Sequence, residues 1–155
     1  MEQIPAILTS ITNLAISTPP NCFFEVDDFE SKWEFMEPFD FIFGRNIAGC
    51  ARDFPLLFRQ AKESLNNGGW IEFSDFIPIP FSDDGTDAEA PITVDWCANL
   101  IKASRRFGKD LNAVVNYKQW MIDAGFKNVR EEVYKVFFVP STKSQYPCPN
   151  RLAAM

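Results

Sequence analysis

The chain of 155 residues contains no histidine. This absence excludes Ser-His-Asp and Cys-His catalytic arrangements, and it excludes metal sites built on imidazole. Any proton transfer would therefore depend on aspartate, glutamate, tyrosine, lysine or water.

Cysteine is scarce and scattered, and its positions are Cys22, Cys50, Cys97 and Cys148. The spacings never form the Cys-x-x-Cys pair that structural zinc sites use, and they do not indicate a disulfide framework. We expect free thiols in a reducing compartment and no metal site.

Long apolar runs and an excess of basic residues are also missing. No run reaches the roughly 18 residues needed to span a bilayer, and the first residues lack the basic segment of a signal peptide. The net charge is -6 and the pI is near 4.7, which disfavours a phosphate backbone or an anionic membrane as partner. We expect an intracellular protein, cytoplasmic or nuclear, that binds neither nucleic acid nor membrane.

The composition is that of a globular domain with its own core, since 46% of the residues are hydrophobic and 23% are charged. Nearly continuous apolar runs predict strands at residues 22–26, 39–43, 70–76 and 129–139. The apolar stretch of residues 4–17 is compatible with a helix or a strand, and both interpretations stand.

A helix is predicted after Asp53, which can cap it, with Pro55 in its first turn. The Asn-Asn-Gly-Gly sequence at residues 66–69 tolerates positive φ and should end this helix in a turn. With the strands on either side, the segment forms a strand–helix–strand unit of a parallel sheet. The apolar stripe of the helix consists of Phe54, Leu57, Phe58, Ala61 and Leu65.

The second half of the chain predicts a loop or lid at residues 77–93, followed by two helices. Asn116 and Gln119 predict a capping box for the second of these, which should end at Gly125. The order of elements predicts an α/β layered domain with a mainly parallel sheet, whose last strand is either parallel or antiparallel, and a tail at residues 140–155. The first of the two helices should end before Gly108 and present one face formed by Trp96, Leu100, Ala103 and Phe107.

Five ordered motifs between residues 19 and 139 resemble the fungal LaeA-like group of S-adenosylmethionine-dependent methyltransferases. They are PPNCFFEVDDFESKW, FDFIFGRNIAG, FPLLFRQAKESLNNGGWIEFSDF, SDDGT and WMIDAGFKNVREEVYKV. The resemblance implies an incomplete class I methyltransferase fold, which is Rossmann-like, with S-adenosyl-L-methionine as cofactor. It also implies a small-molecule substrate of fungal secondary metabolism.

The resemblance gives the paired carboxylates after the first of these strands a role in cofactor binding. Asp27 or Asp28 would accept a hydrogen bond from the adenine amino group, and Phe29 would pack on the ring. The same carboxylates can also cap a helical segment at residues 29–33. One residue can do both, so both interpretations stand.

The next strand ends in Gly44-Arg45-Asn46, where the family places the methionine part of the cofactor and the substrate. By resemblance, Arg45 would pair with a carboxylate of the cofactor or substrate, with Asn46 beside it at the same edge. The alternative is an ordinary surface arginine at a strand end.

No residue stands out as catalytic. We expect Glu72 and Asp75 to be carboxylates at the solvent edge, or carboxylates that support neighbouring groups, in preference to catalytic residues. Trp96 and Trp120 occupy helical positions that suit a core or a substrate lid, and the core is the favoured interpretation.

Two further parts of a cofactor site are not recognisable. In such sites a glycine-rich turn lets the backbone approach the ligand closely, and a second acid holds the ribose hydroxyls. Residues 1–18 contain no glycine and only Glu2 as an acid, and Asn13 stands where the ribose acid would be expected. We therefore expect an atypical N-terminal segment at residues 1–18, a methyltransferase-like domain at residues 19–139, and impaired cofactor binding.

The strand that is missing from this resemblance is central in the family's fold, so its loss would leave a sheet edge with unpaired backbone groups. Residues 6–16, a protein partner or a second copy of the chain would cover that edge. Three functional hypotheses follow. They are a methyltransferase-like protein of secondary metabolism, a non-catalytic pseudo-methyltransferase acting as a protein-binding or regulatory subunit, and a cofactor-free isomerase or cyclase.

Overall fold

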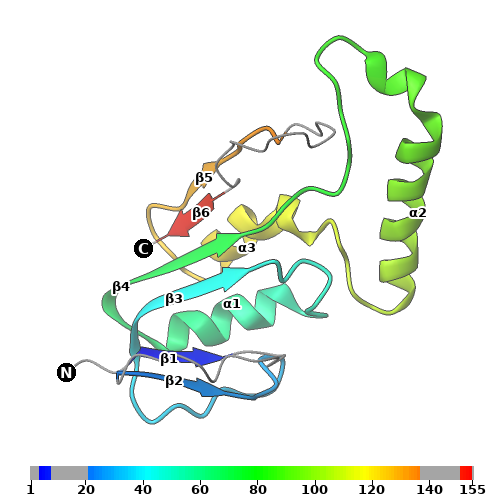
Figure 1. The fold of residues 1–155 in the computed structure, drawn as a ribbon. Helices are drawn as coiled ribbons and strands as arrows, with labels where there is room; N and C mark the ends of the chain where they lie inside the picture. Colours follow the sequence, from blue (N-terminus) through cyan, green and yellow to red (C-terminus); the bar gives the residue numbers. More distant parts are fainter. Residues whose placement is uncertain (1–3, 8–20, 137–150, 155) are drawn as a thin grey trace. The chain divides into compact units, whose positions relative to one another are not determined.

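The computed structural model describes residues 4–7, 21–136 and 151–154 (Figure 1). The chain divides into two compact units, Met1–Trp33 and Glu34–Met155. This division reflects compactness and does not test the domain boundaries expected at residues 18 and 139, which stay predictions. Each unit is described by itself below.

The first unit contains a pair of parallel strands, β1 (Ile4–Ile7) and β2 (Cys22–Glu25). Strand β2 confirms the prediction of a strand at residues 22–26 to within one residue. Strand β1 settles the first part of the undecided segment in favour of a strand, while residues 8–17, including Asn13, lie outside the described residues. The register pairs Ile4 with Cys22 and Ile7 with Glu25, so Asp27 and Asp28 follow directly at the carboxyl end of β2.

The second unit is built on a four-stranded sheet with the order β3-β4-β6-β5. Its strands are β3 (Phe39–Arg45), β4 (Leu65–Ser74), β5 (Arg130–Glu132) and β6 (Arg151–Ala154). Strand β3 is parallel to β4, and β6 is antiparallel to both of its neighbours, β4 and β5. Consequently β5 runs in the same direction as β3 and β4, which answers the question left open for the last predicted strand.

Strand β6 falls within the tail predicted at residues 140–155, so residues 151–154 of that tail form part of the sheet. It inserts between β4 and β5 in the sheet, pairing Phe73 with Leu152 and Arg130 with Ala153. A four-residue strand is too short for sequence periodicity to identify it, and its backbone pairing on both sides supplies the stabilisation instead.

Helix α1 (Phe54–Glu63) begins where the sequence predicts it. The carboxylate of Asp53 accepts a hydrogen bond from the Leu56 N–H at 2.7 Å, and Pro55 lies in the first turn, where its missing N–H costs nothing. The predicted strand–helix–strand unit is thus confirmed as β3-α1-β4. Its apolar stripe is buried at Phe54, Leu57, Phe58 and Ala61.

The predicted turn at residues 66–69 lies inside β4, which already begins at Leu65. The pairing of β3 with β4 shifts register across this segment, and Gly68 takes a φ of +84° there. A Cβ atom on Gly69 would lie 3.2 Å from the Asp40 carbonyl oxygen, which is tighter than ordinary contact. The glycines therefore form an irregularity within the strand, because the helix has already ended at Glu63.

Helix α2 (Pro91–Arg106) begins within the predicted loop and follows a short 3-10 turn, η1 (Thr86–Glu89). Trp96 is 63% exposed, so the favoured core interpretation of this residue was wrong. The buried contacts of α2 come from the opposite side of the helix, at Ile101. None of the helices in the described ranges is long and apolar enough to cross a membrane.

The last helical segment consists of η2 (Ala113–Asn116) and α3 (Tyr117–Asp123). The predicted capping box was wrong: the Asn116 side chain makes no capping hydrogen bond, and Gln119 donates forward to Asp123 at 2.8 Å. The predicted end at Gly125 is confirmed by its φ of +90°, a conformation that favours glycine.

The core of the second unit is aromatic and lies where α1 and α3 pack together and α1 packs on β4. Phe58 and Tyr117 are completely buried, with their ring centroids 5.5 Å apart, and Phe73 from β4 completes the contact. On the opposite side of the strands, Phe41 and Phe43 are each about half exposed. The core therefore holds α1 and α3 on one face of the sheet, while apolar side chains of β3 stay exposed on the other.

We predict that Phe58→Ala lowers the free energy of unfolding by about 3–5 kcal/mol, because it opens a cavity in this cluster. Phe76 is 51% exposed, and Phe76→Ala is the matched control, with an expected loss of at most about 1 kcal/mol. Chemical denaturation followed by fluorescence measures both. Equal losses in the two variants would contradict the assignment of the core.

Candidate functional site

The carboxyl ends of β3 and β4 lie at the same edge of the sheet, because the two strands are parallel and Arg45 pairs with Ser74. The loop that leaves β3 contains Asn46, and Asp75 follows β4 directly. Ligands of open α/β sheets bind at this edge, outside the carboxyl ends of the strands. It is the candidate functional edge of the second unit.

The chain turns sharply as it leaves β3. Asn46 has a φ of +54°, in the left-handed region that asparagine tolerates better than most residues, and its N–H donates to the Ser74 carbonyl at 3.0 Å. Just before it, a Cβ atom on Gly44 would lie 2.8 Å from the Phe73 ring. Glycine at this position therefore leaves space for the Phe73 ring beside β3 at the functional edge.

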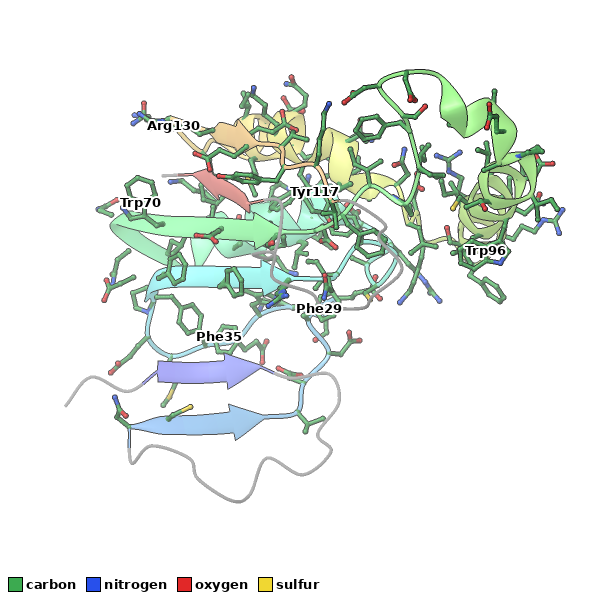
Figure 2. The ribbon with its side chains drawn as sticks, turned by 45° about the horizontal axis from the view of Figure 1, so that its top comes forward. Phe29, Phe35, Trp70, Trp96, Tyr117 and Arg130 are labelled. Atoms are coloured by element: carbon green, nitrogen blue, oxygen red, sulfur yellow. The ribbon has the colours of Figure 1, made fainter. Side chains whose placement is uncertain are left out.

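Asp75 is the buried carboxylate that holds this loop, with an exposed fraction of only 4%. It accepts hydrogen bonds from the N–H groups of Ile47 and Ala48, both at 3.2 Å, and from the Tyr117 hydroxyl at 3.1 Å. Tyr117 is the first residue of α3 and lies among the side chains beside the sheet (Figure 2). One side chain thus joins the ends of two strands and a helix.

Burial controls the ionisation of this pair. It raises the pKa of Asp75 above its ordinary value, and the hydrogen bonds from Ala48, Tyr117 and Ile47 offset this effect only in part. Burial, followed by the negative charge and the hydrogen bond of Asp75, raises the pKa of Tyr117 far above its ordinary value. The Tyr117 hydroxyl therefore keeps its proton and remains a donor to Asp75 at physiological pH.

The expectation that Glu72 and Asp75 lie at a solvent edge was wrong, since both are buried, at 7% and 4% exposure. The alternative expectation, that they support neighbouring groups, agrees with the hydrogen bonds of Asp75. The sequence pattern missed Tyr117 entirely. Its signal is indirect: it lies four positions before Met121, which is also buried, and so belongs to the inner face of α3.

Arg45 and Asn46 are both exposed at the functional edge. Arg45 pairs with Ser74 in the sheet and the Asn46 N–H donates to the Ser74 carbonyl, directly before the loop that Asp75 anchors. Their pairing with a cofactor or substrate stays a prediction.

Asp27, Asp28 and Phe29 belong to the first unit and lie in a tight turn after β2. The Asp28 N–H donates to the Asp27 carboxylate at 2.8 Å, and the Glu30 N–H donates to the Asp28 carboxylate at 3.0 Å. Phe29 and Glu30 form a turn and residues 32 and 33 belong to no helix, so the expected helical segment at residues 29–33 was wrong, while the Asp28 carboxylate does cap the turn. Their adenine contact stays a prediction.

A cavity of about 420 Å³ opens beside the start of α1, lined by residues 51–55, the segment after α2 and Trp120. Trp120 is half-buried and stacks on Phe54, with ring centroids 5.9 Å apart and planes 7° apart. It therefore belongs both to the core and to the wall of the cavity. Arg105 and Asp110, also in the lining, form an ion pair at 3.1 Å.

The chemistry of a metal or redox centre does not appear in the described part of the chain. Cys22, Cys50 and Cys97 are free thiols. No group of three or more acidic or cysteine side chains within residues 4–7, 21–136 and 151–154 is arranged to hold a metal ion.

Sequence comparison relates the chain to fungal methyltransferases, although no family model matches it. It is 32% identical over 118 residues to methyltransferase pytC of Aspergillus terreus, covering 76% of this chain and 36% of pytC. It is 33% identical over 126 residues to probable methyltransferase tdiE of Emericella nidulans, covering 81% and 38%. It is 31% identical over 121 residues to the secondary metabolism regulator LAE1 of Cochliobolus heterostrophus, covering 76% and 39%.

Solved structures agree on the fold. A protein from Listeria monocytogenes assigned as an S-adenosylmethionine-dependent methyltransferase superposes with a TM-score of 0.59 at 17% identity, covering 99% of this chain and 78% of that one. Human N-acetylserotonin methyltransferase in complex with SAM superposes with a TM-score of 0.51 at 13% identity, covering 92% and 36%. At such identities the likeness establishes the fold alone.

The fold and its carboxyl edge define the class: the chain has an incomplete Rossmann-like fold of the class I methyltransferase type. Within that class, the chain is a homologue of the fungal S-adenosylmethionine-dependent methyltransferases, including a LaeA-like regulator. The resemblance found in the motifs is confirmed. The chain spans between 36% and 39% of the length of the three fungal relatives.

We predict that burial of Asp75 makes stability depend on pH. Because its folded-state pKa is raised, the folded state holds the proton more tightly than the unfolded state does. The contribution of Asp75 to the free energy of unfolding therefore falls as pH rises from the ordinary aspartate value through the raised folded value. Asp75→Asn, which does not ionise, removes this dependence.

The measurement is chemical denaturation of the chain and of Asp75→Asn at a series of pH values. Glu63→Gln, at an exposed carboxylate of α1, is the control and should retain the slope of the parent chain. The prediction would be contradicted if the free energy of unfolding of the parent, relative to that of Asp75→Asn, stayed constant or increased with rising pH.

Proposed function

We propose that this chain is a methyltransferase-family protein of fungal secondary metabolism whose residues supply the adenine side of an S-adenosylmethionine site. The observation that carries the proposal is 31–33% identity to fungal methyltransferases and a regulator across about three quarters of the chain. The Rossmann-like fold supports it, since this fold binds nucleoside-containing cofactors at the carboxyl ends of its strands.

The turn after β2 fits the adenine end of the cofactor. The adenine amino group needs an acceptor, and Asp27 and Asp28 are both exposed. Each carboxylate has about four acceptor positions, so the bonds within the turn leave room for a ligand. The half-buried ring of Phe29 lies next to them in the chain and offers an apolar surface for the base (Figure 2).

The remaining parts of the cofactor fit this chain poorly. Residues 1–43 contain no glycine, so this stretch offers no glycine-rich turn to admit the methionine part close to the backbone. We infer that the polypeptide by itself binds the cofactor weakly and chiefly through adenine. When bound, S-adenosylmethionine supplies the electrophilic methyl group, and catalysis rests on positioning.

The substrate side of the proposal rests on the functional edge of the second unit. Arg45 would hold an anionic group of a small-molecule substrate, and Asn46 would donate or accept a hydrogen bond beside it. Both depend on the loop that Asp75 holds through Ile47 and Ala48. In this account Asp75 positions the edge and does not touch substrate.

A second candidate function, protein binding without catalysis, is favoured by one observation. Phe41 and Phe43 stack on the open face of β3 with centroids 6.4 Å apart, and their neighbour Trp70 is 43% exposed. Contiguous exposed aromatic side chains are typical of interaction surfaces. A regulatory subunit would use such a face without completing a cofactor site.

We predict weak binding of S-adenosylhomocysteine, the product form that carries no sulfonium charge, with a Kd on the order of 1 mM, or about -4 kcal/mol. Saturation-transfer difference NMR detects binding in this range. The adenine protons should receive the most saturation and the methionine-part protons the least. Micromolar affinity, no transfer, or strongest transfer to the methionine part would each contradict the proposed adenine site.

The double variant Asp27→Asn/Asp28→Asn sharpens this test. The amide oxygen at position 28 can still accept from the Glu30 N–H, so the turn persists. Loss of the charge should weaken adenine binding at least about threefold, since charge-assisted hydrogen bonds are roughly twice as strong as neutral ones. Glu63→Gln also removes one exposed carboxylate and should leave the adenine signals unchanged.

A further inference from the structure

Helix α2 carries its larger apolar side chains on the outside. Its inward face consists of modest side chains that are buried or half-buried, namely Val94, Cys97, Ala98, Ile101 and Ser104. Its outward stripe exposes Ile92 by 84%, Trp96 by 63%, Leu100 by 39% and Phe107, at the helix end, by 76%. A helix normally buries its bulkier apolar stripe, so this arrangement indicates a surface that another molecule covers.

The spacing of the outward stripe is symmetric about its middle. Ile92 and Trp96 are four positions apart, and so are Ala103 and Phe107. When a second copy of α2 runs antiparallel, with a twofold axis near Asn99 and Leu100, the outward stripes of the two copies contact each other. Trp96 then lies over the small Ala103 of the other copy, and Ile92 lies over its Phe107, so large and small side chains interdigitate.

The charges beside the stripe match the same arrangement. At 3.6 residues per turn, Asp95, Lys102 and Arg106 fall on one flank of the stripe. In an antiparallel pair this flank faces its own copy, and Asp95 comes opposite position 104 of the other helix. It therefore lies between Lys102 and Arg106 of that copy, at both ends of the pair.

A parallel twofold pair would place this flank on opposite sides of the two helices, so Asp95 would not meet Lys102 or Arg106 of the other copy. The antiparallel pair therefore brings these opposite charges together, and the parallel pair does not. We propose that the outward stripe of α2, formed by Ile92, Trp96, Leu100, Ala103 and Phe107, binds a second copy of the chain in an antiparallel, twofold-symmetric helix pair.

The area of the stripe sets the strength of the pair. An aromatic side chain buries about 150–250 Å² when fully covered. With the observed exposures, the stripe offers roughly 400 Å² per copy, or about half of a standard interface of about 800 Å² per partner. The chain should therefore form a weak dimer in rapid exchange with the monomer.

Sedimentation velocity of the full chain over a concentration series tests the pair. We expect the weight-average sedimentation coefficient to rise toward that of a dimer, and Trp96→Ala to weaken the association roughly thirtyfold, as truncation of a central aromatic anchor does. Trp70→Ala, at an exposed tryptophan of β4, is the matched control and should associate like the parent. Because Trp96 is mostly exposed, its truncation leaves the core intact.

A charge exchange distinguishes this pair from other modes of association. Asp95→Lys and Lys102→Glu/Arg106→Glu each place like charges at both ends of a homodimer, so each variant alone should be monomeric. An equimolar mixture restores opposite charges at both ends and should associate at least as well as the parent chain.

Three outcomes would overturn the proposal. One is a parent chain that stays monomeric up to its solubility limit, which would assign the stripe to a different occupant. Another is association that Trp70→Ala abolishes and Trp96→Ala leaves intact, which would assign the contact to the sheet. The last is a mixture of the charge variants that stays as monomeric as its components.

Discussion

The arrangement of the second unit depends on one buried carboxylate. Asp75 accepts hydrogen bonds from the Ile47 and Ala48 amides and from the Tyr117 hydroxyl. The two amides belong to the loop after β3, and Tyr117 is the first residue of α3. Removing a carboxylate from water is costly, and its cost is offset only where donors surround it. This requirement fixes the loop after β3 against the end of β4 and the start of α3, and with it the position of the functional edge.

The two groups of candidate ligand-binding residues are held by different kinds of interaction. Asp28 sits in a turn whose bonds span only a few residues, so the adenine-side carboxylates depend on local sequence. Arg45 and Asn46 depend on contacts with Ser74 of β4, and Asp75 holds the loop that follows them through Ile47, 28 positions away. The alignments with the fungal methyltransferases and the regulator extend over 118 to 126 of the 155 residues, and the chain spans well under half the length of those relatives. The proposed protein contacts depend on a different feature, the exposed apolar side chains of β3 and α2.

Sequence reasoning succeeded where the cause of a structure is local. The capping carboxylate of Asp53 and the strand–helix–strand pattern around it predict α1 because each signal acts within one turn or one strand. It failed where contacts with distant segments of the chain determine the local structure. The tail strand β6 exists because β4 and β5 pair with it, and Trp96 is exposed because nothing else in the described chain packs on its side of α2. The partnership of Asp75 with Tyr117 spans 42 positions and has no local signature.

The central claim is that Asp75 holds the loop at the functional edge through backbone hydrogen bonds. Amide hydrogen exchange at Ile47 and Ala48, resolved by NMR, tests this claim directly. We expect exchange at least about a hundredfold slower than in an unstructured peptide, and loss of that protection in Asp75→Ala at a pH where the remaining core stays folded. Exchange at Ile47 and Ala48 as fast as in an unstructured peptide would contradict it.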